Sequence, residues 1–173
     1  MVLAHGFGGS ARNWRPQLRS LRGSHRTIVY DARGHARSAA PEAAAAYRID
    51  AFVDDLLDVA ARTGDPRPVL GGLSFGAAVA LRAALTAPEQ VRALVLTSLP
   101  AGPESDRGIA ARAAAFAEAI DADGLEAAGG RFVWGEGSGL DAAGARWVRQ
   151  GFLEHAPHAL AHTLRETLAK LEP

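Results

Sequence analysis

A serine flanked by glycines is the part of the chain best suited to chemistry. Ser74 lies between Gly72 and Gly76 in a G-x-S-x-G pattern. The apolar residues 68–73 predict a buried strand before it, and the small residues of 75–87 predict a helix after it. At so sharp a strand-to-helix turn the hydroxyl stands clear of the backbone, and the first helical N–H groups can stabilise an oxyanion. The pattern predicts that Ser74 is a catalytic nucleophile.

The two glycines have a steric reason to be there. Such a turn brings the strand end and the helix start so close that a Cβ atom at Gly72 or Gly76 would clash. Because the chain holds 19 glycines in 173 residues, an incidental serine in a glycine-rich turn is the alternative interpretation. The strand and helix patterns on either side of Ser74 favour the catalytic one.

Two further runs follow the ends of predicted strands. The first is His5-Gly6-Phe7-Gly8-Gly9-Ser10, and the second is Asp31-Ala32-Arg33-Gly34-His35-Ala36-Arg37-Ser38. In this order, and together with the run around Ser74, they resemble the α/β-hydrolase superfamily, in the branch with a helical cap after the sixth strand. The resemblance covers residues 1–100, and beyond them only helical character is shared.

The resemblance implies roles for these residues. The backbone N–H groups of Phe7 and Phe75 would form the oxyanion hole, with both side chains facing the substrate. His5 and Gly6 would shape the oxyanion loop, and His5 would be structural because the family's base comes from a much later loop. Residues 31–38 would form a structural turn.

The elements that must position these runs alternate between strand and helix. Four apolar runs bounded by turn residues predict buried strands, at residues 2–4, 27–31, 68–73 and 91–97. Asn13 and Asp50 are expected to cap two helices, and Gly64 to end the second. That second helix carries an apolar stripe of Phe52, Val53, Leu56, Leu57 and Ala60. The fold class is therefore α/β, a parallel sheet of about four strands covered by helices, forming a partial α/β-hydrolase core.

The second part of the chain has a different pattern. Residues 101–173 are alanine-rich and predict a helical cap or lid, next to the partial core at residues 1–100. Glycine-rich residues 129–139 predict a bend between cap helices. Trp134 and Trp147 are candidate walls of a substrate pocket, although apolar residues of a cap also form its own core.

The sequence marks the base and the acid that would activate Ser74 less clearly than Ser74 itself. A serine nucleophile needs a base and an acid that orients it, and in this family the order is Ser, acid, His. Because residues 101–173 predict no further strand, and the chain starts almost at the third family strand, we expect truncation at both ends. Glu104 and Asp106 are candidates for the acid.

Three late histidines are expected to line or decorate the cap. They are His155, His158 and His162. The alternatives are a base for Ser74 or, for His158 and His162 on one helix face, a pair of metal ligands.

A dinucleotide-binding loop is a competing interpretation of the first glycine run. Residues 6–11 also fit G-x-G-x-x-A, and Asp31 follows at the end of the next strand. In that fold the glycine loop opens directly into a helix, whereas Asn13 and Pro16 predict a later start. This interpretation also leaves His5 and Ser74 unexplained.

Composition excludes several classes of function. The 19 basic and 19 acidic residues cancel, which gives no indication of nucleic acid or membrane partners. Without cysteine there is neither a disulfide nor a thiolate site. We expect a cytoplasmic protein that needs neither a metal nor an organic cofactor and acts on a small molecule.

The sequence therefore predicts a serine hydrolase. It would cleave an ester or related acyl bond of a small, largely apolar substrate through an acyl-Ser74 intermediate. One alternative is a truncated chain that lacks the acid and base and binds a ligand or partner with little turnover. Another alternative is a protein of the same fold that catalyses carbon–carbon bond hydrolysis, lactone opening or perhydrolysis. Exposed sheet edges would favour a homo-oligomer.

Overall fold

The chain divides into two compact units. The structure, a computed structural model, describes residues 1–99 and 103–171, and the side chains of these residues except 103–107. The first unit comprises Met1–Arg33 and Ile49–Pro100, and the second comprises Gly34–Arg48 and Ala101–Pro173. Residues 34–48, which the sequence-based division assigned to the core, therefore belong to the second unit. The expected division at residue 100 falls outside the described residues.

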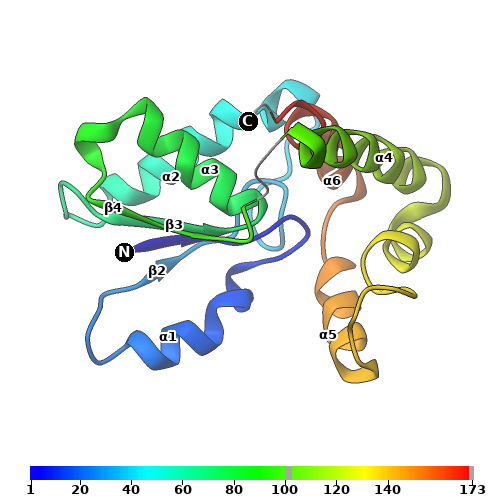
Figure 1. Cartoon of the computed structure of the whole chain (residues 1–173), viewed down its shortest axis with the longest axis horizontal. Helices are drawn as coiled ribbons and strands as arrows, with labels where there is room; N and C mark the ends of the chain where they lie inside the picture. Colours follow the sequence, from blue (N-terminus) through cyan, green and yellow to red (C-terminus); the bar gives the residue numbers. More distant parts are fainter. Residues whose placement is uncertain (100–102, 172–173) are drawn as a thin grey trace. The chain divides into compact units, whose positions relative to one another are not determined.

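A parallel sheet of four strands forms the first unit (Figure 1). The strands are β1 (Val2–Ala4), β2 (Ile28–Val29), β3 (Val69–Leu73) and β4 (Ala93–Thr97), in the order β2-β1-β3-β4. All three neighbouring pairs run parallel, with Leu3 opposite Val29 on one side and Gly71 on the other. The four predicted strands are confirmed, although the second, third and fourth are shorter than predicted. The parallel arrangement brings the carboxyl ends of β1, β2 and β3 to one edge of the sheet.

Helices cover both faces of this sheet. Helix α1 (Arg15–Leu21) lies on one face, and α2 (Ile49–Ala61) and α3 (Phe75–Thr86) lie on the other (Figure 1). A 3₁₀ turn, η3 (Pro88–Gln90), follows α3 and shows that Pro88 ends this helix as predicted. The α/β fold class predicted from the sequence is therefore correct.

The starts of two helices differ from the predictions. Before α1, a 3₁₀ turn, η1 (Ala11–Trp14), is capped by Ser10, while the side chain of Asn13 accepts from the Ser10 N–H at 2.7 Å. The expected cap residue thus serves as the reciprocal member of a capping box. Asp50 does not cap α2 either, because the helix begins at Ile49 and Asp50 lies in its first turn. A carboxylate there still favours the positive end of the helix dipole.

The predicted stripe of α2 is largely confirmed. Its buried members are Phe52, Val53, Leu56 and Ala60, whereas Leu57 stays partly exposed. Gly64 has a φ of +76°, as expected for a residue just beyond a helix end.

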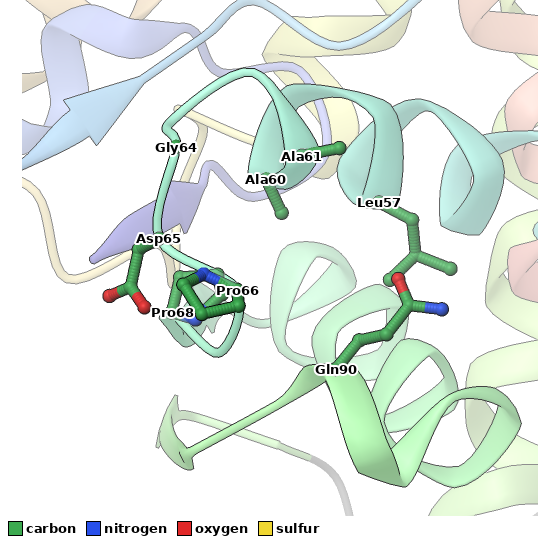
Figure 2. Close-up of a pocket in the computed structure, with 8 residues that line it drawn as sticks. All are labelled: Leu57, Ala60, Ala61, Gly64, Asp65, Pro66, Pro68 and Gln90. Atoms are coloured by element: carbon green, nitrogen blue, oxygen red, sulfur yellow. The ribbon is translucent and has the colours of Figure 1, made fainter.

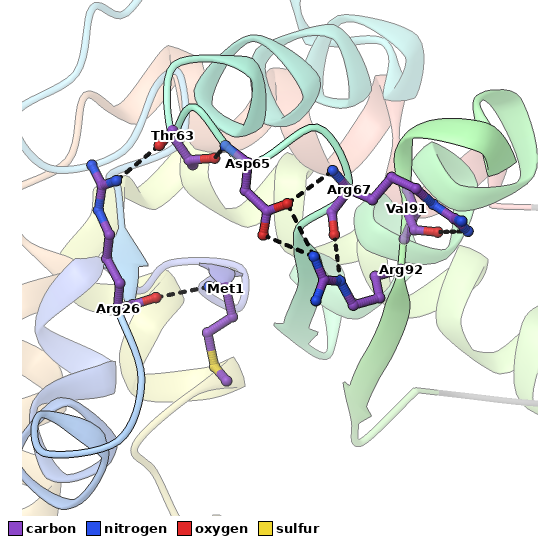
Figure 3. Close-up of polar contacts among 7 residues, drawn as sticks. All are labelled: Met1, Arg26, Thr63, Asp65, Arg67, Val91 and Arg92. Atoms are coloured by element: carbon purple, nitrogen blue, oxygen red, sulfur yellow. Dashed lines mark hydrogen bonds and ion pairs between the residues drawn. The ribbon is translucent and has the colours of Figure 1, made fainter.

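A polar network links the segments at the amino ends of the strands (Figure 3). Asp65 Oδ1 accepts from the Arg67 N–H at 3.0 Å and pairs with the Arg92 guanidinium at 3.2 Å. The Arg92 Nε–H donates to the Arg67 carbonyl at 2.9 Å, and Arg26 donates to the Thr63 carbonyl at 2.8 Å. These bonds join the segments that lead into β2, β3 and β4.

The second unit is helical. It contains η2 (Ala44–Tyr47), α4 (Pro103–Phe132), α5 (Ala142–Phe152), α6 (Pro157–Glu166) and η4 (Leu168–Lys170). Helix α4 is kinked at Gly124, which has a φ of +78°. The bend predicted at residues 129–139 starts later, because α4 continues to Phe132 and α5 begins at Ala142.

Aromatic stacking and long-range hydrogen bonds stabilise this unit. Phe116 stacks on Phe132 with ring centroids 4.6 Å apart, and Phe152 is fully buried beside them. The Thr167 hydroxyl donates to the carbonyl of Tyr47 at 2.6 Å across 120 residues of sequence. This bond fastens residues 34–48 to the end of the chain.

Strand β4 is exposed although it belongs to a parallel sheet. Its residues alternate between exposed and half-buried, and 47% of Val95 is exposed. Parallel strands are normally covered on both faces.

Within the described part of the chain, helices that combine the length and apolar character needed to cross a bilayer are absent.

Candidate active site

Ser74 has a strained backbone at the junction of β3 and α3. Its φ of +52° and ψ of −113° belong to a region that glycine normally occupies. The Ser74 N–H donates to the Thr97 carbonyl at 2.8 Å, and its own carbonyl accepts from Ala77 and Ala78 at 2.9 and 3.1 Å. Strain of this kind costs about 1–3 kcal/mol and is found mainly at functional sites. The hydroxyl group therefore lies on a turn that the surrounding structure holds in place.

The neighbouring glycines are required by close backbone packing. A Cβ atom on Gly72 would overlap the backbone of Gly76. A Cβ atom on Gly76 would lie 2.5 Å from the carbonyl oxygens of Ala4 and His5. The steric role expected for both glycines is thus present, and the start of α3 packs directly on the end of β1.

The glycine run after β1 forms a tight turn beside Ser74. The Gly9 N–H donates to the Gly6 carbonyl at 3.0 Å, and Gly8 has a φ of +65°, as in a type II turn. A Cβ atom on Gly6 would lie 3.3 Å from the carbonyl oxygen of Leu73. The turn containing Phe7 therefore packs against the residue immediately before Ser74.

The expectation that Phe75 faces the substrate is wrong. Only 2% of Phe75 is exposed, and its ring packs edge-to-face on Phe52 with centroids 4.9 Å apart. The side chain joins the core between α2 and α3. Its backbone N–H lies in the first turn of α3, where helix N–H groups point toward the N-terminus. Phe7 is half-buried.

His5 is held by two backbone groups. It is 1% exposed, its Nε2 accepts from the Ala32 N–H at 3.0 Å, and its Nδ1 lies 2.8 Å from the Gly6 carbonyl oxygen. These contacts agree with the structural role that the resemblance implies. The pairing of His5 with Ala32 was missed from the sequence, although His5 directly follows β1 and Ala32 lies shortly after the neighbouring strand β2.

The segment after β2 is fastened on two sides. Asp31 Oδ1 accepts from the Ala11 N–H at 2.8 Å. The Arg33 guanidinium forms two bonds of 2.7 Å with the Asp55 carboxylate on α2. The start of this run, at Asp31 and Arg33, is therefore tied both to the residues after the Phe7 turn and to α2.

Tyr30 is expected to make the free energy of unfolding depend on pH. Burial, and then the Asp55 carboxylate, raise the pKa of Tyr30 well above its usual value of 10.0. In the unfolded chain the Tyr30 hydroxyl loses its proton near pH 10, while in the folded chain it keeps the proton to higher pH. The contribution of Tyr30 to the free energy of unfolding is therefore complete below pH 10 and falls as the pH rises further. We expect the free energy of unfolding to fall less steeply above pH 10 in Tyr30→Phe than in the native chain. Equal slopes in urea unfolding at several pH values would contradict this assignment.

The two tryptophans proposed as pocket walls have different surroundings. Trp134 packs on Phe152 with ring centroids 5.6 Å apart, and its ring fills the space where a side chain on Gly129 would lie. Trp147 on α5 is 50% exposed. Trp134 thus contributes to the aromatic core of the second unit, and Trp147 lies on its surface.

The late histidines contact residues 34–48 or their neighbours within the second unit. His155 packs edge-to-face on buried His35, with ring centroids 5.2 Å apart. His158 Nε2 lies 3.3 Å from the Ala40 carbonyl oxygen, and the His162 ring lies 5.6 Å from that of Tyr47. These contacts agree with the expected cap role. The side chains of Glu104 and Asp106, the candidate acids, lie outside the described residues.

Figure 2 shows a hollow in the first unit. It has a volume of about 340 Å³ and includes Pro68, which precedes β3, whereas Ser74 follows β3 at the other end. Its walls are Leu57, Ala60, Ala61, Gly64, Asp65, Pro66, Pro68 and Gln90. Its position gives it no part in chemistry at Ser74.

Known proteins resemble the chain in sequence. A family model described as alpha/beta hydrolase fold matches residues 1–133. Epoxide hydrolase 4 of Mus musculus is 32% identical over 100 residues, which are 58% of this chain and 28% of that protein. A protein of Variovorax paradoxus that is named as a carbamate hydrolase is 39% identical over 106 residues, 61% of this chain and 40% of its own. The chain therefore aligns with less than half the length of these two relatives.

Solved structures resemble it over most of its length. A thermophilic esterase from Thermogutta terrifontis matches with a TM-score of 0.78 and 25% identity. The match covers 98% of this chain and 62% of that one.

Proposed function

Because the chain belongs to the α/β-hydrolase fold family, we propose that it carries the nucleophile and oxyanion site of a serine hydrolase that cleaves acyl bonds. The observation that carries this proposal is the backbone of Ser74, held at a φ of +52° between β3 and α3. A serine is retained here at a position where glycine would be less strained. A nucleophilic role gives a reason for that cost.

The proposed oxyanion donors are the backbone N–H groups of Phe7 and Phe75. Negative charge develops on the carbonyl oxygen when a serine attacks an acyl carbon, and two fixed N–H groups stabilise it. Gly76 packs against the His5 carbonyl, and Gly6 packs against the Leu73 carbonyl, so the backbones that carry both donors are in contact. The dipole of α3 adds to the positive potential at Phe75.

The nucleophile type favours acyl substrates over epoxides. Attack of Ser74 on an ester or carbamate gives an acyl or carbamoyl ester, which water can cleave. Attack on an epoxide would give a serine ether, which water does not readily cleave. We therefore favour carboxylic ester or carbamate hydrolysis, although a relative is named as an epoxide hydrolase. Lactones are cyclic esters and fall within the same chemistry.

A substrate panel tests this assignment. We expect the chain to hydrolyse a short-chain nitrophenyl ester or the matching carbamate, and to leave a styrene oxide probe unchanged. The same panel with Ser74→Ala measures the background rate. Turnover of the epoxide without turnover of either acyl substrate would contradict the proposal.

Turnover also requires a base and an acid. In the first unit His5 bonds to Ala32 and Gly6, and Asp31 bonds to Ala11, so we assign neither to the triad. A chain whose Ser74 reacts with a fluorophosphonate but which hydrolyses no ester would support the alternative of binding with little turnover. The proposal keeps the expectations of a small, largely apolar substrate, a cytoplasmic location and no metal or organic cofactor.

We also propose that two copies of the chain associate through β4. The strand presents Ala93, Val95 and Thr97 as exposed residues, and the run from Ala93 to Thr97 contains no charged side chain to discourage pairing. We expect sedimentation velocity to detect a dimer of the native chain and a monomer of Val95→Lys. A control, Leu85→Lys, changes an exposed residue of α3 and should leave the dimer intact. A native chain that stays monomeric at high micromolar concentration would contradict this association.

A further inference from the structure

The charges of the first unit are unevenly distributed. Basic and acidic residues cancel over the whole chain, but residues 1–30 contain no aspartate or glutamate. The arginines of this segment are Arg12, Arg15, Arg19, Arg22 and Arg26. The zero net charge gave no indication of a membrane partner because it averages over this strongly basic first segment.

Three of these arginines share one side of helix α1. Arg15, Arg19 and Arg22 lie at positions i, i+4 and i+7, and Arg22 continues the helix with a φ of −55° and a ψ of −25°. Residues with this spacing lie one above the other, and a helical rise of about 1.5 Å per residue spreads them over roughly 10 Å. All three are exposed, and in the described part of the chain none of them forms an ion pair with a carboxylate. We call these three residues the α1 arginine face.

Arg26 adds a further positive charge beyond the end of α1. Its guanidinium donates to the Thr63 carbonyl at 2.8 Å. A carbonyl carries no net charge, so this bond fixes the direction of the side chain without neutralising it. The basic segment therefore extends beyond the helix itself.

Most acidic residues of the first unit lie on the other side of the sheet. Helix α2 carries Asp50, Asp54, Asp55 and Asp58, and it covers the sheet face opposite to α1 (Figure 1). The other acidic residues of this unit are Asp31, Asp65 and Glu89. Asp31 accepts from the Ala11 N–H, and Asp65 pairs with Arg92 at the amino ends of the strands. The α1 arginine face is thus separated from most carboxylates of its own unit.

An exposed row of uncompensated arginines favours an anionic partner. At an anionic bilayer each arginine near the surface strengthens binding about fivefold, and the attraction acts over about 8 Å at physiological ionic strength. Proteins that bind single-stranded nucleic acid stack its bases on aromatic side chains. Within residues 1–33, all of which the structure describes, no aromatic side chain is exposed. This composition favours a charged lipid surface over a nucleic acid strand.

We propose that the α1 arginine face binds the anionic surface of a lipid bilayer by electrostatic attraction. The choice of lipid rests on the proposed function, because a small, largely apolar ester partitions into bilayers and a hydrolase bound at their surface meets it there. The charge distribution does not depend on that function. A peripheral contact of this kind agrees with the expected cytoplasmic location.

Sedimentation of the native chain with vesicles tests the proposal. We expect binding at low salt to vesicles made of equal parts of phosphatidylcholine and phosphatidylserine, and none to vesicles of phosphatidylcholine alone. High salt should release the chain, because the screening length falls to about 3 Å at 1 M. Equal binding to both kinds of vesicle, or none to the anionic ones at low salt, would overturn the proposal.

Two double variants with the same change in net charge separate the α1 arginine face from general charge effects. Arg19→Gln/Arg22→Gln is expected to weaken binding to the anionic vesicles about 20-fold. The control, Arg62→Gln/Arg82→Gln, changes two exposed arginines at the end of α2 and on α3, which cover the other face of the sheet. It should weaken binding less than about threefold. Equal losses in the two variants would overturn the assignment to α1.

Nucleic acid is the alternative anionic partner. Fluorescence anisotropy with a labelled DNA duplex and with its single strand measures this binding at the same salt. If more of the chain binds DNA than vesicles at equal phosphate concentration, the assignment to a lipid surface is wrong.

Hydrolysis of a soluble nitrophenyl ester separates this inference from the proposed function. We expect equal rates for the native chain and Arg19→Gln/Arg22→Gln, because neither arginine belongs to the proposed catalytic site. A lower rate in the variant would show that these arginines act on the site and not on a bilayer. If the native chain hydrolyses no ester, the proposed function fails, and the vesicle measurements still decide whether α1 binds lipid.

Discussion

Replacing Ser74 with alanine is expected to lower the rate of ester hydrolysis by about 10⁴-fold or more, to the background of the assay. The change removes the only proposed nucleophile and leaves the Cβ atom, the backbone conformation and both oxyanion donors in place. KM for residual turnover should stay similar, because binding of the ground state does not require the hydroxyl. The measurement is nitrophenyl ester hydrolysis by the two proteins at equal concentration. Equal rates would remove Ser74 from the mechanism.

A glycine at the same position separates strain from chemistry. Ser74→Gly should be as inactive as Ser74→Ala, yet more stable, because glycine adopts a φ of +52° and a ψ of −113° without a Cβ penalty. Relief of about 1–3 kcal/mol of strain, reduced by roughly 0.5–1 kcal/mol of extra unfolded-state entropy, leaves a net gain of about 1 kcal/mol. Urea unfolding measures the difference between the two variants. A glycine variant less stable than the alanine variant would contradict the strain assigned to Ser74.

Replacing Gly72 with alanine is expected to destabilise the chain by about 3 kcal/mol or more, because the new methyl group would overlap the backbone of Gly76. Backbone atoms at a helix start have little room to move away, unlike the end of a flexible side chain. The corresponding fall in Tm is roughly 6–12 °C for a chain of this length. Thermal unfolding followed by circular dichroism measures it.

Gly23 provides the matched control for that substitution. A Cβ atom there would meet no neighbour within 4 Å, and this residue has no positive φ. Gly23→Ala should therefore lie within about 0.5 kcal/mol of the native chain. If Gly72→Ala were as mild as this control, the close packing between β3 and α3 would be refuted.

The features that the sequence predicted well are local ones. The glycines around Ser74, the apolar runs of the strands and Pro88 after α3 each act within a few residues, so their patterns carry the information. The parallel sheet followed from the alternation of strand and helix. At the junction of β3 and α3 the steric need for Gly72 and Gly76 is confirmed, whereas the catalytic role of Ser74 stays a prediction.

The features that the sequence did not predict depend on distant neighbours. Phe75 was expected to face the substrate, but its direction is set by Phe52 on α2, 23 residues earlier. The bond between His5 and Ala32 spans 27 residues, and that between Thr167 and Tyr47 spans 120. Such partners are chosen by the packing of whole elements, which no short pattern records.

The same limit applies to the cap. The sequence allows Trp134 either to line a pocket or to form part of the cap's core. The structure shows it packed on Phe152 of α5 and over Gly129 of α4, and an alanine-rich sequence does not specify such contacts.

The helix caps were misplaced by a few residues for a different reason. Ser10 and Asn13 are both good capping residues, and only the capping-box geometry distinguishes their roles.

The most direct test of a serine nucleophile at position 74 is the site of covalent modification by a fluorophosphonate. Such a reagent phosphonylates an activated serine with loss of fluoride, and the tetrahedral adduct places an oxygen in the oxyanion site. Intact-mass measurement and peptide mapping of the native chain are expected to show one adduct, on Ser74, and none on Ser74→Ala. No adduct on the native chain, or an adduct on a different residue, would contradict the assignment of Ser74 as the nucleophile.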